Sequence, residues 1–179
     1  MMINIQPAIF LVPMIVLILV VLMYFSLLKN TAHKTVFKRL IFVITVLAFL
    51  LNFIWELFHL PLYKDSSYDI QHIAFCALAS VADALMVLLL YVCFAHLNKK
   101  PFWALGMNYL KLFVLMLVGG IGAIIAEVAH TAAGNWAYAD AMPILPVFNV
   151  GLTPVLQFLI LPALIYYLSF YLIKKISKQ

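Results

Sequence analysis

Residues 40–62 read LIFVITVLAFLLNFIWELFHLPL, an apolar stretch in which the only acidic or basic side chain is that of Glu56, with His59 three residues later. A hydrocarbon core about 30 Å thick needs about 20 apolar residues in a helix, so this stretch is long enough to cross a bilayer. Similar stretches occur at about 7–28, 73–97, 108–132 and 152–173. The sequence therefore predicts an all-α integral membrane bundle of five transmembrane helices, forming one domain over residues 1–179.

The composition of the chain excludes a water-soluble fold. Hydrophobic residues make up 68% of the 179 residues and charged residues 9%, and the mean hydropathy is +1.15. A soluble domain of this composition would expose large apolar patches, so the lipid bilayer is the expected partner. The net charge of +5 comes from short clusters at the ends of the apolar stretches. Because these clusters form no continuous patch, we expect no nucleic-acid partner.

Basic residues are unequally divided between the two ends of the predicted helices. When the chain is threaded through five spans, Lys64 lies on one side and the other basic residues lie on the opposite side: Lys29, Lys34, Lys38, Arg39, Lys99, Lys100, Lys111, Lys174, Lys175 and Lys178. Positive residues accumulate on the cytoplasmic side of membrane proteins. We therefore expect the N-terminus outside and the C-terminus in the cytoplasm, in the cytoplasmic (inner) membrane of a bacterium.

Glycine and proline residues predict local features of the last two helices. Gly119, Gly120 and Gly122 should allow close helix contact, because small residues let helix backbones approach each other in a membrane. Thr153 is suited to cap the fifth helix, with a proline directly after it. Pro162 inside this helix should free the carbonyl of Phe158 and introduce a kink.

Polar side chains form stripes on three predicted helices, in their outer halves except for Asp83, which is expected near mid-membrane. The second helix has Asn52, Glu56 and His59 on one face, with Tyr63 above them. The stripe of the third helix consists of His72, Cys76, Ser80 and Asp83, and that of the fourth consists of Glu127 and His130. A carboxyl group in the centre of a membrane helix costs about 3 kcal/mol on insertion scales, so it usually faces the interior of a bundle. The sequence therefore predicts a shared polar pocket around Glu56.

Two Glu-x-x-His pairs, Glu56 with His59 and Glu127 with His130, favour an alternative site. This spacing lets both side chains of a pair bind one divalent metal ion, as in carboxylate-bridged bundles. Those bundles need further ligands, for which the chain offers Asp83 or His72. Alternatively, the histidines lie at the membrane interface as amphipathic rings.

The loop at about 131–151 is unusually apolar for a connector on the outer side. Trp136 and Tyr138 fit an aromatic belt at the membrane surface, and the same residues fit a lid over a pocket. Two prolines in it, Pro143 and Pro146, prevent a regular helix.

Three segments carry a resemblance to known families: NFIWELFHLPLY at 52–63, WAYADAMP at 136–143 and GLTPVLQ at 151–157. Together they resemble an uncharacterised bacterial family of small multispan membrane proteins. The NFIWE core at 52–56 is also similar to a motif of integral-membrane terpene cyclases, and Glu127 with GNWAY at 134–138 resembles membrane carotenoid-modifying enzymes. The cyclase resemblance implies that Glu56 protonates an apolar polyene or epoxide.

These patterns lead to one functional expectation and two alternatives. We expect an acid–base enzyme, of cyclase or isomerase type, for a lipophilic isoprenoid-like small molecule, with Glu56 as general acid and Asp83 or Glu127 as its partner. The remaining pocket residues are these: Asn52, Trp55, Tyr63, His72, Trp136, Tyr138 and Gln157. This mechanism requires no cofactor. The alternatives are a metal- or haem-binding redox protein using His59 and His130, and a non-catalytic transporter, lipid-binding or assembly protein. No particular oligomeric state is predicted.

Overall fold

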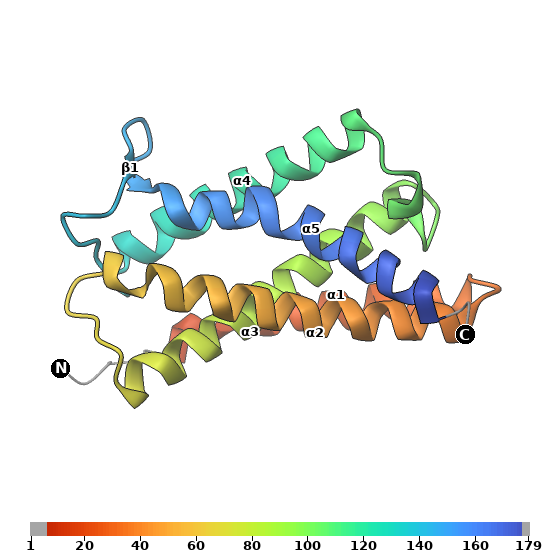
Figure 1. The fold of residues 1–179 in the computed structure, drawn as a ribbon, viewed down its shortest axis with the longest axis horizontal. Helices are drawn as coiled ribbons and strands as arrows, with labels where there is room; N and C mark the ends of the chain where they lie inside the picture. The colour runs from red at the N-terminus through yellow and green to blue at the C-terminus, as the bar shows by residue number, and fades with distance from the viewer. Residues whose placement is uncertain (1–6, 177–179) are drawn as a thin grey trace.

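Five long helices lie side by side in the computed structural model, which describes residues 7–176 (Figure 1). Their bounds are α1 Leu11–Lys29, α2 Lys34–His59, α3 Ile70–Leu97, α4 Tyr109–Ala132 and α5 Leu152–Ile176. Short 3-10 turns, η1 Pro7–Phe10 and η2 Leu60–Leu62, precede α1 and follow α2. All five helices are long and apolar enough to cross a membrane. The predicted all-helical fold with five candidate spans is confirmed.

One helix start and one predicted helix cap differ from the sequence prediction. α2 begins at Lys34 and not near residue 40, and Phe37 and Leu40 in its first turns are fully buried. A search for uninterrupted apolar sequence misses this extension, because the exposed residues Lys38 and Arg39 lie on the same turns as the buried ones. α5 begins at Leu152, so Thr153 is not its N-cap and lies within its first turn.

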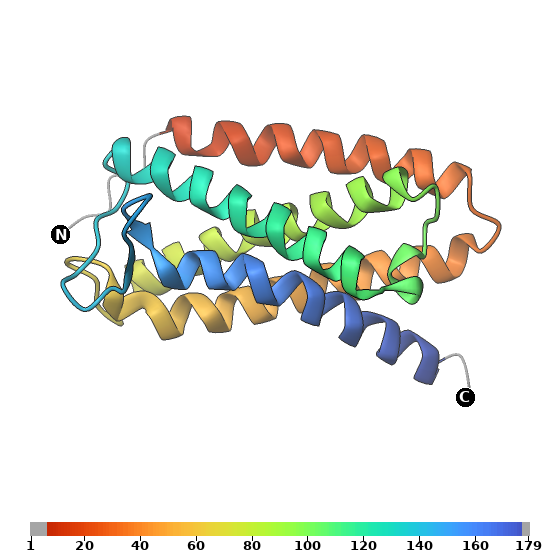
Figure 2. The same cartoon turned by 90° about the horizontal axis from the view of Figure 1, so that it is seen from above.

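The helices pack in the order α1, α3, α2, α5 and α4, which differs from their order in the chain. α3 packs on α1 and α2, whereas α4 packs on α5 and not on its sequence neighbour α3. In the view of Figure 2, α1 runs along one edge of the bundle and α4 is drawn between α1 and α5. The bundle is therefore a curved layer whose first and last members, α1 and α4, leave a gap over α3.

Close contact between α4 and α5 depends on two glycines. A Cβ atom at Gly119 would overlap the carbonyl oxygen of Phe158, and one at Gly120 would lie 2.9 Å from Leu159 Cδ2. The Phe158 carbonyl is the one that Pro162 frees from its helical hydrogen bond. Gly122 differs, since a Cβ there would meet nothing within 4 Å.

The connection from α3 to α4 is anchored by a buried tryptophan. Trp103, in the 3-10 turn η3 Trp103–Gly106, donates its indole hydrogen to the carbonyl of Tyr91 at 3.1 Å. Tyr91 in turn donates its hydroxyl to the carbonyl of Pro101 at 2.7 Å. The Trp103 ring also packs edge-on against Tyr166 of α5. The connection is thereby held against α3 and α5 before α4 begins.

The loops at the other end of the bundle are joined by backbone pairing. The α4–α5 loop contains a small hairpin of β1 Ile144–Leu145 and β2 Val150–Gly151. The same loop pairs with the chain that follows α2, through Lys64 N to Ala137 O and Ala139 N to Leu62 O, both 2.9 Å. This loop is therefore fastened over the end of α2.

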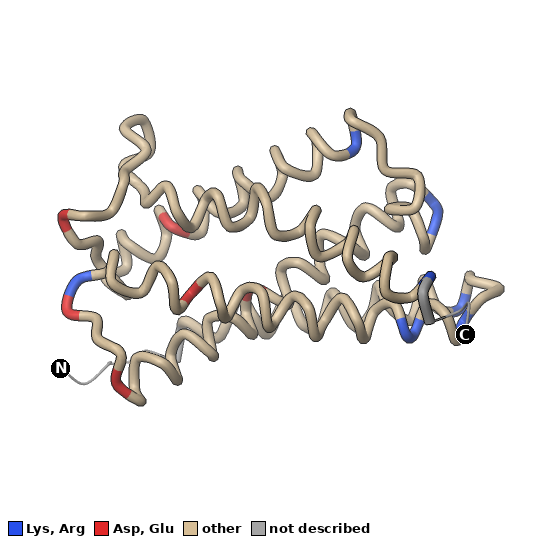
Figure 3. Tube along the Cα trace, viewed as in Figure 1, with Lys and Arg blue, Asp and Glu red and all other residues tan. Residues whose placement is uncertain are grey.

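Charge is segregated along the bundle (Figure 3). Asp65, Asp69 and Asp140 lie in the loops where α2 and α4 end, together with Lys64. Lys99 and Lys100 of the α3–α4 connection lie at the opposite end, as do the basic residues at the end of α1 and the start of α2. Glu56, Asp83 and Glu127 lie within helices, between these ends.

Candidate functional site

A buried amide joins three helices in the interior of the bundle. Gln157 of α5 donates from Nε2 to Asn52 Oδ1 of α2 at 2.8 Å and to Asp83 Oδ2 of α3 at 3.0 Å. Asn52 donates its own amide to the carbonyl of Ala48 at 2.7 Å. Gln157 and Asn52 are 2% and 1% exposed, so neither can exchange these partners for water.

Two carboxyl groups meet beside this amide. The side chain of Glu56, one turn further along α2 than Asn52, lies within hydrogen-bonding range of Asp83. Two carboxyl groups at this range can form a hydrogen bond with each other only when one of them holds a proton. Asp83 also accepts the hydrogen bond from the side-chain amide of Gln157. The structure thus brings together Asn52, Glu56, Asp83 and Gln157, four of the residues that the sequence analysis named.

His59 extends the pair toward the loop end of the bundle. Its Nε2 atom is 3.1 Å from Glu56 Oε2, although the angle is not that of a hydrogen bond and Nε2 has no hydrogen-bond partner among the described residues. Its Nδ1 atom is 3.4 Å from the hydroxyl of Thr153. His59 is 4% exposed, so its contact with Glu56 lies inside the protein.

Glu127 of α4 forms a second carboxyl centre below the α4–α5 loop. Trp136 donates its indole hydrogen to Glu127 Oε2 at 3.2 Å, and Tyr138 donates its hydroxyl to the same oxygen. Glu127 is 7% exposed. Two donors on one buried oxygen fix the position of this carboxyl group.

Tyr63 lies between the two carboxyl centres. Its ring centroid is 5.5 Å from that of His59 and 5.8 Å from that of Tyr138. Burial, followed by the charge of Glu127, raises the pKa of Tyr63. Burial and the hydrogen bond to Glu127 likewise raise the pKa of Tyr138. Both phenols therefore keep their protons at physiological pH, and Tyr138 uses its proton to donate to Glu127.

Three of the predicted site residues lie elsewhere. Trp55 packs against the hydrophobic core, and its indole nitrogen has no hydrogen-bond partner among residues 7–176. His72 lies at the start of α3, with Nδ1 2.7 Å from Asp69. His130 stacks on Trp136 with ring centroids 4.4 Å apart and contacts the amide of Asn135 at 2.7 Å. These side chains are engaged outside the carboxyl pair.

The two Glu-x-x-His pairs do not converge on one point. Within the described part of the chain, no three His, Cys, Asp or Glu side chains are grouped as ligands of a metal ion. Glu127 accepts from Trp136 and Tyr138, whereas His130 is directed to Asn135 and the Trp136 ring face. A divalent metal held jointly by His59, His130, Glu56 and Glu127 does not fit this geometry.

Thr153 is a contact of the site that the sequence patterns missed. It lies one helical turn before Gln157, so both face the same side of α5, and its hydroxyl donates to Met142 Sδ at 3.3 Å. The spacing of four residues from Gln157 was the available signal. Its role is to connect His59 to the loop that covers Glu127.

Similarity to other proteins assigns no family to this chain. Comparisons with protein-family models, with curated proteins and with solved structures found no match. The functional assignment therefore rests on the contacts of the polar side chains described above.

Proposed function

We propose that the protein is an acid–base enzyme of cyclase or isomerase type that acts on a lipophilic isoprenoid-like molecule within the membrane. The observation that supports this function is the contact between the carboxyl groups of Glu56 and Asp83, held by Gln157 in an otherwise apolar bundle. Ionisable groups inside membrane bundles are costly and usually functional. A proton shared between these two carboxyl groups could be transferred to a lipophilic substrate without the participation of water.

The proposed reaction begins with transfer of the shared proton to a carbon–carbon double bond. The carboxyl O–H bond breaks, a C–H bond forms, and the other alkene carbon becomes cationic. A second double bond of the same molecule then attacks this carbon and closes a ring. Loss of a proton from a neighbouring carbon to the carboxylate restores the pair, so the product is an isomer of the substrate and nothing is oxidised or reduced.

Each carboxyl group has a separate role in this scheme. Glu56 is the acid, because it contacts both Asp83 and the His59 ring. Asp83 shares the proton and is oriented by Gln157. Around Glu127, the rings of Tyr63, Trp136 and Tyr138 offer π faces that stabilise cationic charge. Glu127 supports the fixed positions of the last two rings.

The charge distribution supports a proposed orientation in the bacterial inner membrane. The lysine-rich ends of the helices face the cytoplasm and the loops with Asp65, Asp69 and Asp140 face outward, following the accumulation of positive residues inside. This placement puts the carboxyl pair in the outer half of the bilayer, below the fastened α4–α5 loop.

A glutamine substitution at the acid tests the function. Wild-type protein, Glu56→Gln and the matched control Asp140→Asn would be expressed in a bacterial host that accumulates acyclic polyprenyl lipids, and lipid extracts compared by mass spectrometry and chromatography. Asp140 is exposed in the α4–α5 loop, so its change tests the loss of one carboxyl group outside the site. We expect a product isomeric with a host lipid in wild type and control, and its absence in Glu56→Gln.

Infrared spectroscopy of purified protein gives an independent measurement. A protonated carboxyl group has a C=O band separate from that of a carboxylate. We expect this band in the wild type, and a shift or loss of it in Glu56→Gln and in Asp83→Asn. An identical set of lipids in the three strains would refute the proposed reaction, and an unchanged carboxyl band in both variants would refute the shared proton.

A further inference from the structure

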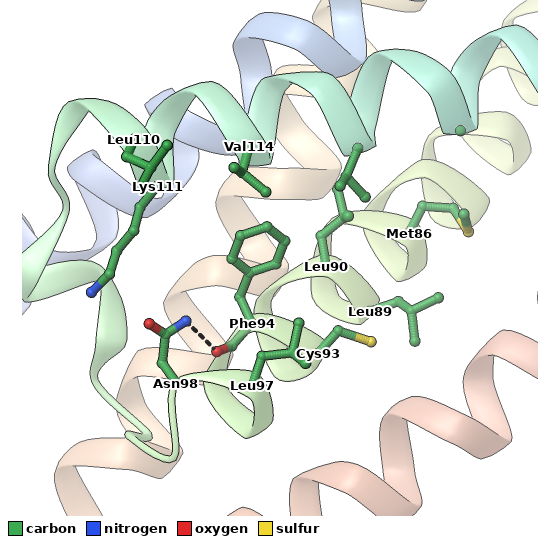
Figure 4. Close-up of a pocket in the computed structure, with 12 residues that line it drawn as sticks. Met86, Leu89, Leu90, Cys93, Phe94, Leu97, Asn98, Leu110, Lys111 and Val114 are labelled. Atoms are coloured by element: carbon green, nitrogen blue, oxygen red, sulfur yellow. Dashed lines mark hydrogen bonds between the residues drawn. The ribbon is translucent and has the colours of Figure 1, made fainter.

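An apolar groove separates α3 from α4 in the half of the bundle that carries the lysines (Figure 4). Its volume is about 600 Å³, within the range of about 300–1,000 Å³ for small-molecule sites. The walls include Met86, Leu90 and Phe94 of α3 and Leu110, Val114 and Val118 of α4. The groove exists because α4 packs on α5 and leaves this face of α3 uncovered.

The polar groups of the groove gather at its lysine-rich end. The Lys111 side chain extends from the first turn of α4 toward the same end as Asn98 of α3 (Figure 4). Lys111 Nζ lies 3.3 Å from the carbonyl of Gly106, which uses one of its three donor hydrogens. Asn98 donates its amide to Phe94 O at 2.8 Å. Lys99 and Lys100 follow in an exposed turn.

No Asp or Glu side chain balances this positive charge nearby. The acidic residues, 6 in all, lie in the middle of the helices or in the loops of the opposite end, and every one of them belongs to the described residues. The end of the groove is therefore complementary to an anion, and its walls are complementary to hydrocarbon.

We infer that this groove binds one anionic membrane phospholipid, with its headgroup phosphate at Lys111 and one acyl chain along α3. Length supports this occupant. From Asn98 to Met86 α3 rises about 18 Å, which is close to the roughly 15 Å of hydrocarbon in one leaflet, half of a core about 30 Å thick. The groove also opens on the lateral surface of the bundle, where lipid would surround the protein.

The groove ends one helical turn from the carboxyl pair. Asp83, Met86, Leu90 and Phe94 are spaced by three and four residues, so they follow one face of α3. A chain in the groove therefore points toward Asp83. The inference concerns lipid binding and goes beyond the proposed reaction, and its test measures no turnover.

Gly122 offers a way to fill the groove without disturbing the helix packing. It lines the groove, and a Cβ atom there would meet nothing within 4 Å. Gly122→Phe should occupy the space of the acyl chain, and Gly122→Leu is the smaller second variant. The matched control is Ile121→Phe, which puts the same ring on the exposed neighbouring position. For the headgroup, Lys111→Gln is compared with Lys38→Gln, an exposed lysine of α2 at the same end.

The measurement is native mass spectrometry of the full chain released from nanodiscs of equal phosphatidylglycerol and phosphatidylcholine. We expect the wild type, Ile121→Phe and Lys38→Gln to retain phosphatidylglycerol in preference to phosphatidylcholine. Lys111→Gln should lower this preference about fivefold, the factor expected for one lysine near an anionic lipid surface. Gly122→Phe and Gly122→Leu should lose the retained lipid.

Two results would overturn the inference. Equal retention of the two lipids by the wild type would show that the site does not select an anionic headgroup. Undiminished phosphatidylglycerol retention by both folded Gly122 variants, judged by size-exclusion profiles, would place the lipid outside the groove.

Discussion

Gln157 on α5 and Asp83 on α3 are joined across the bundle by a hydrogen bond of 3.0 Å from Nε2 to Oδ2. The same nitrogen donates to Asn52 on α2. One buried amide therefore sets the relative position of three helices, and it orients the carboxyl group that contacts Glu56.

Replacing Gln157 by Leu should lower the free energy of unfolding by more than one hydrogen bond between helices contributes. Such bonds average about 0.6 kcal/mol in membrane proteins, but leaving two buried acceptors unpaired adds a cost of about 1–3 kcal/mol. We expect a lower thermal midpoint in detergent, followed by tryptophan fluorescence. Ser169→Ala is the control, because among residues 7–176 this buried hydroxyl bonds only to the carbonyl of Ile165 in its own helix. Equal midpoints for the two variants would contradict a cross-helix role for Gln157.

Alanine substitutions at two glycines of α4 should have opposite effects. Gly119→Ala puts a Cβ atom into the Phe158 carbonyl, which is backbone and cannot rotate away. Overpacking of this kind costs about 1–3 kcal/mol. Gly122→Ala meets no atom within 4 Å and should stabilise the helix by up to about 1 kcal/mol. Unfolding in graded detergent mixtures measures both, and a neutral Gly119→Ala would mean that α4 and α5 are less tightly packed.

The start of α3 should lose stability in acid. Asp69 accepts from the backbone of Gln71 and His72, and from the Ser67 hydroxyl, which holds the pKa of its carboxyl below the usual value. Because the folded-state pKa is the lower one, this stabilisation is complete above the unfolded value of about pH 4. It is lost as the pH falls further, through the folded-state pKa.

Hydrogen exchange of the backbone amides of Gln71, His72 and Ile73 measures this effect. Exchange in the wild type, corrected for its intrinsic pH dependence, should increase below about pH 4. Asp69→Asn keeps an oxygen that can cap the helix, so its exchange should not depend on pH in this range. The same acid response in both proteins would assign the effect to another group.

Cysteine labelling tests the proposed orientation. Ala32→Cys lies in the exposed α1–α2 connection at the lysine-rich end, and Asp140→Cys lies in the exposed loop at the other end. We expect a membrane-impermeant maleimide to label Asp140→Cys in intact spheroplasts and Ala32→Cys only after lysis. Wild-type protein, with Cys76 buried and Cys93 partly buried, supplies the background. Labelling with the reverse pattern would invert the proposed topology.

Apolarity and spacing were sufficient to predict much of the molecule. The number and approximate position of the candidate spans follow from the length of apolar sequence that a bilayer requires, and the structure has those five helices. Periodicity also put Asn52 and Glu56 on one face of α2, and Glu127 on the inner side of α4. These features are local, because each depends on residues within a few helical turns.

Contacts between helices were decided only by the tertiary structure. The Glu-x-x-His spacing is the same in both pairs, yet His59 lies beside Glu56 while His130 is held by Asn135 and Trp136, because the neighbouring loop differs. Likewise, no pattern in the sequence says that α4 packs on α5 and leaves α3 open. Packing order depends on which backbones can approach, as at Gly119 and Phe158, and on where Trp103 anchors the connection. The sequence alone therefore determined the helices and their polar faces, and the packing of the helices decided which polar groups meet and where a groove remains.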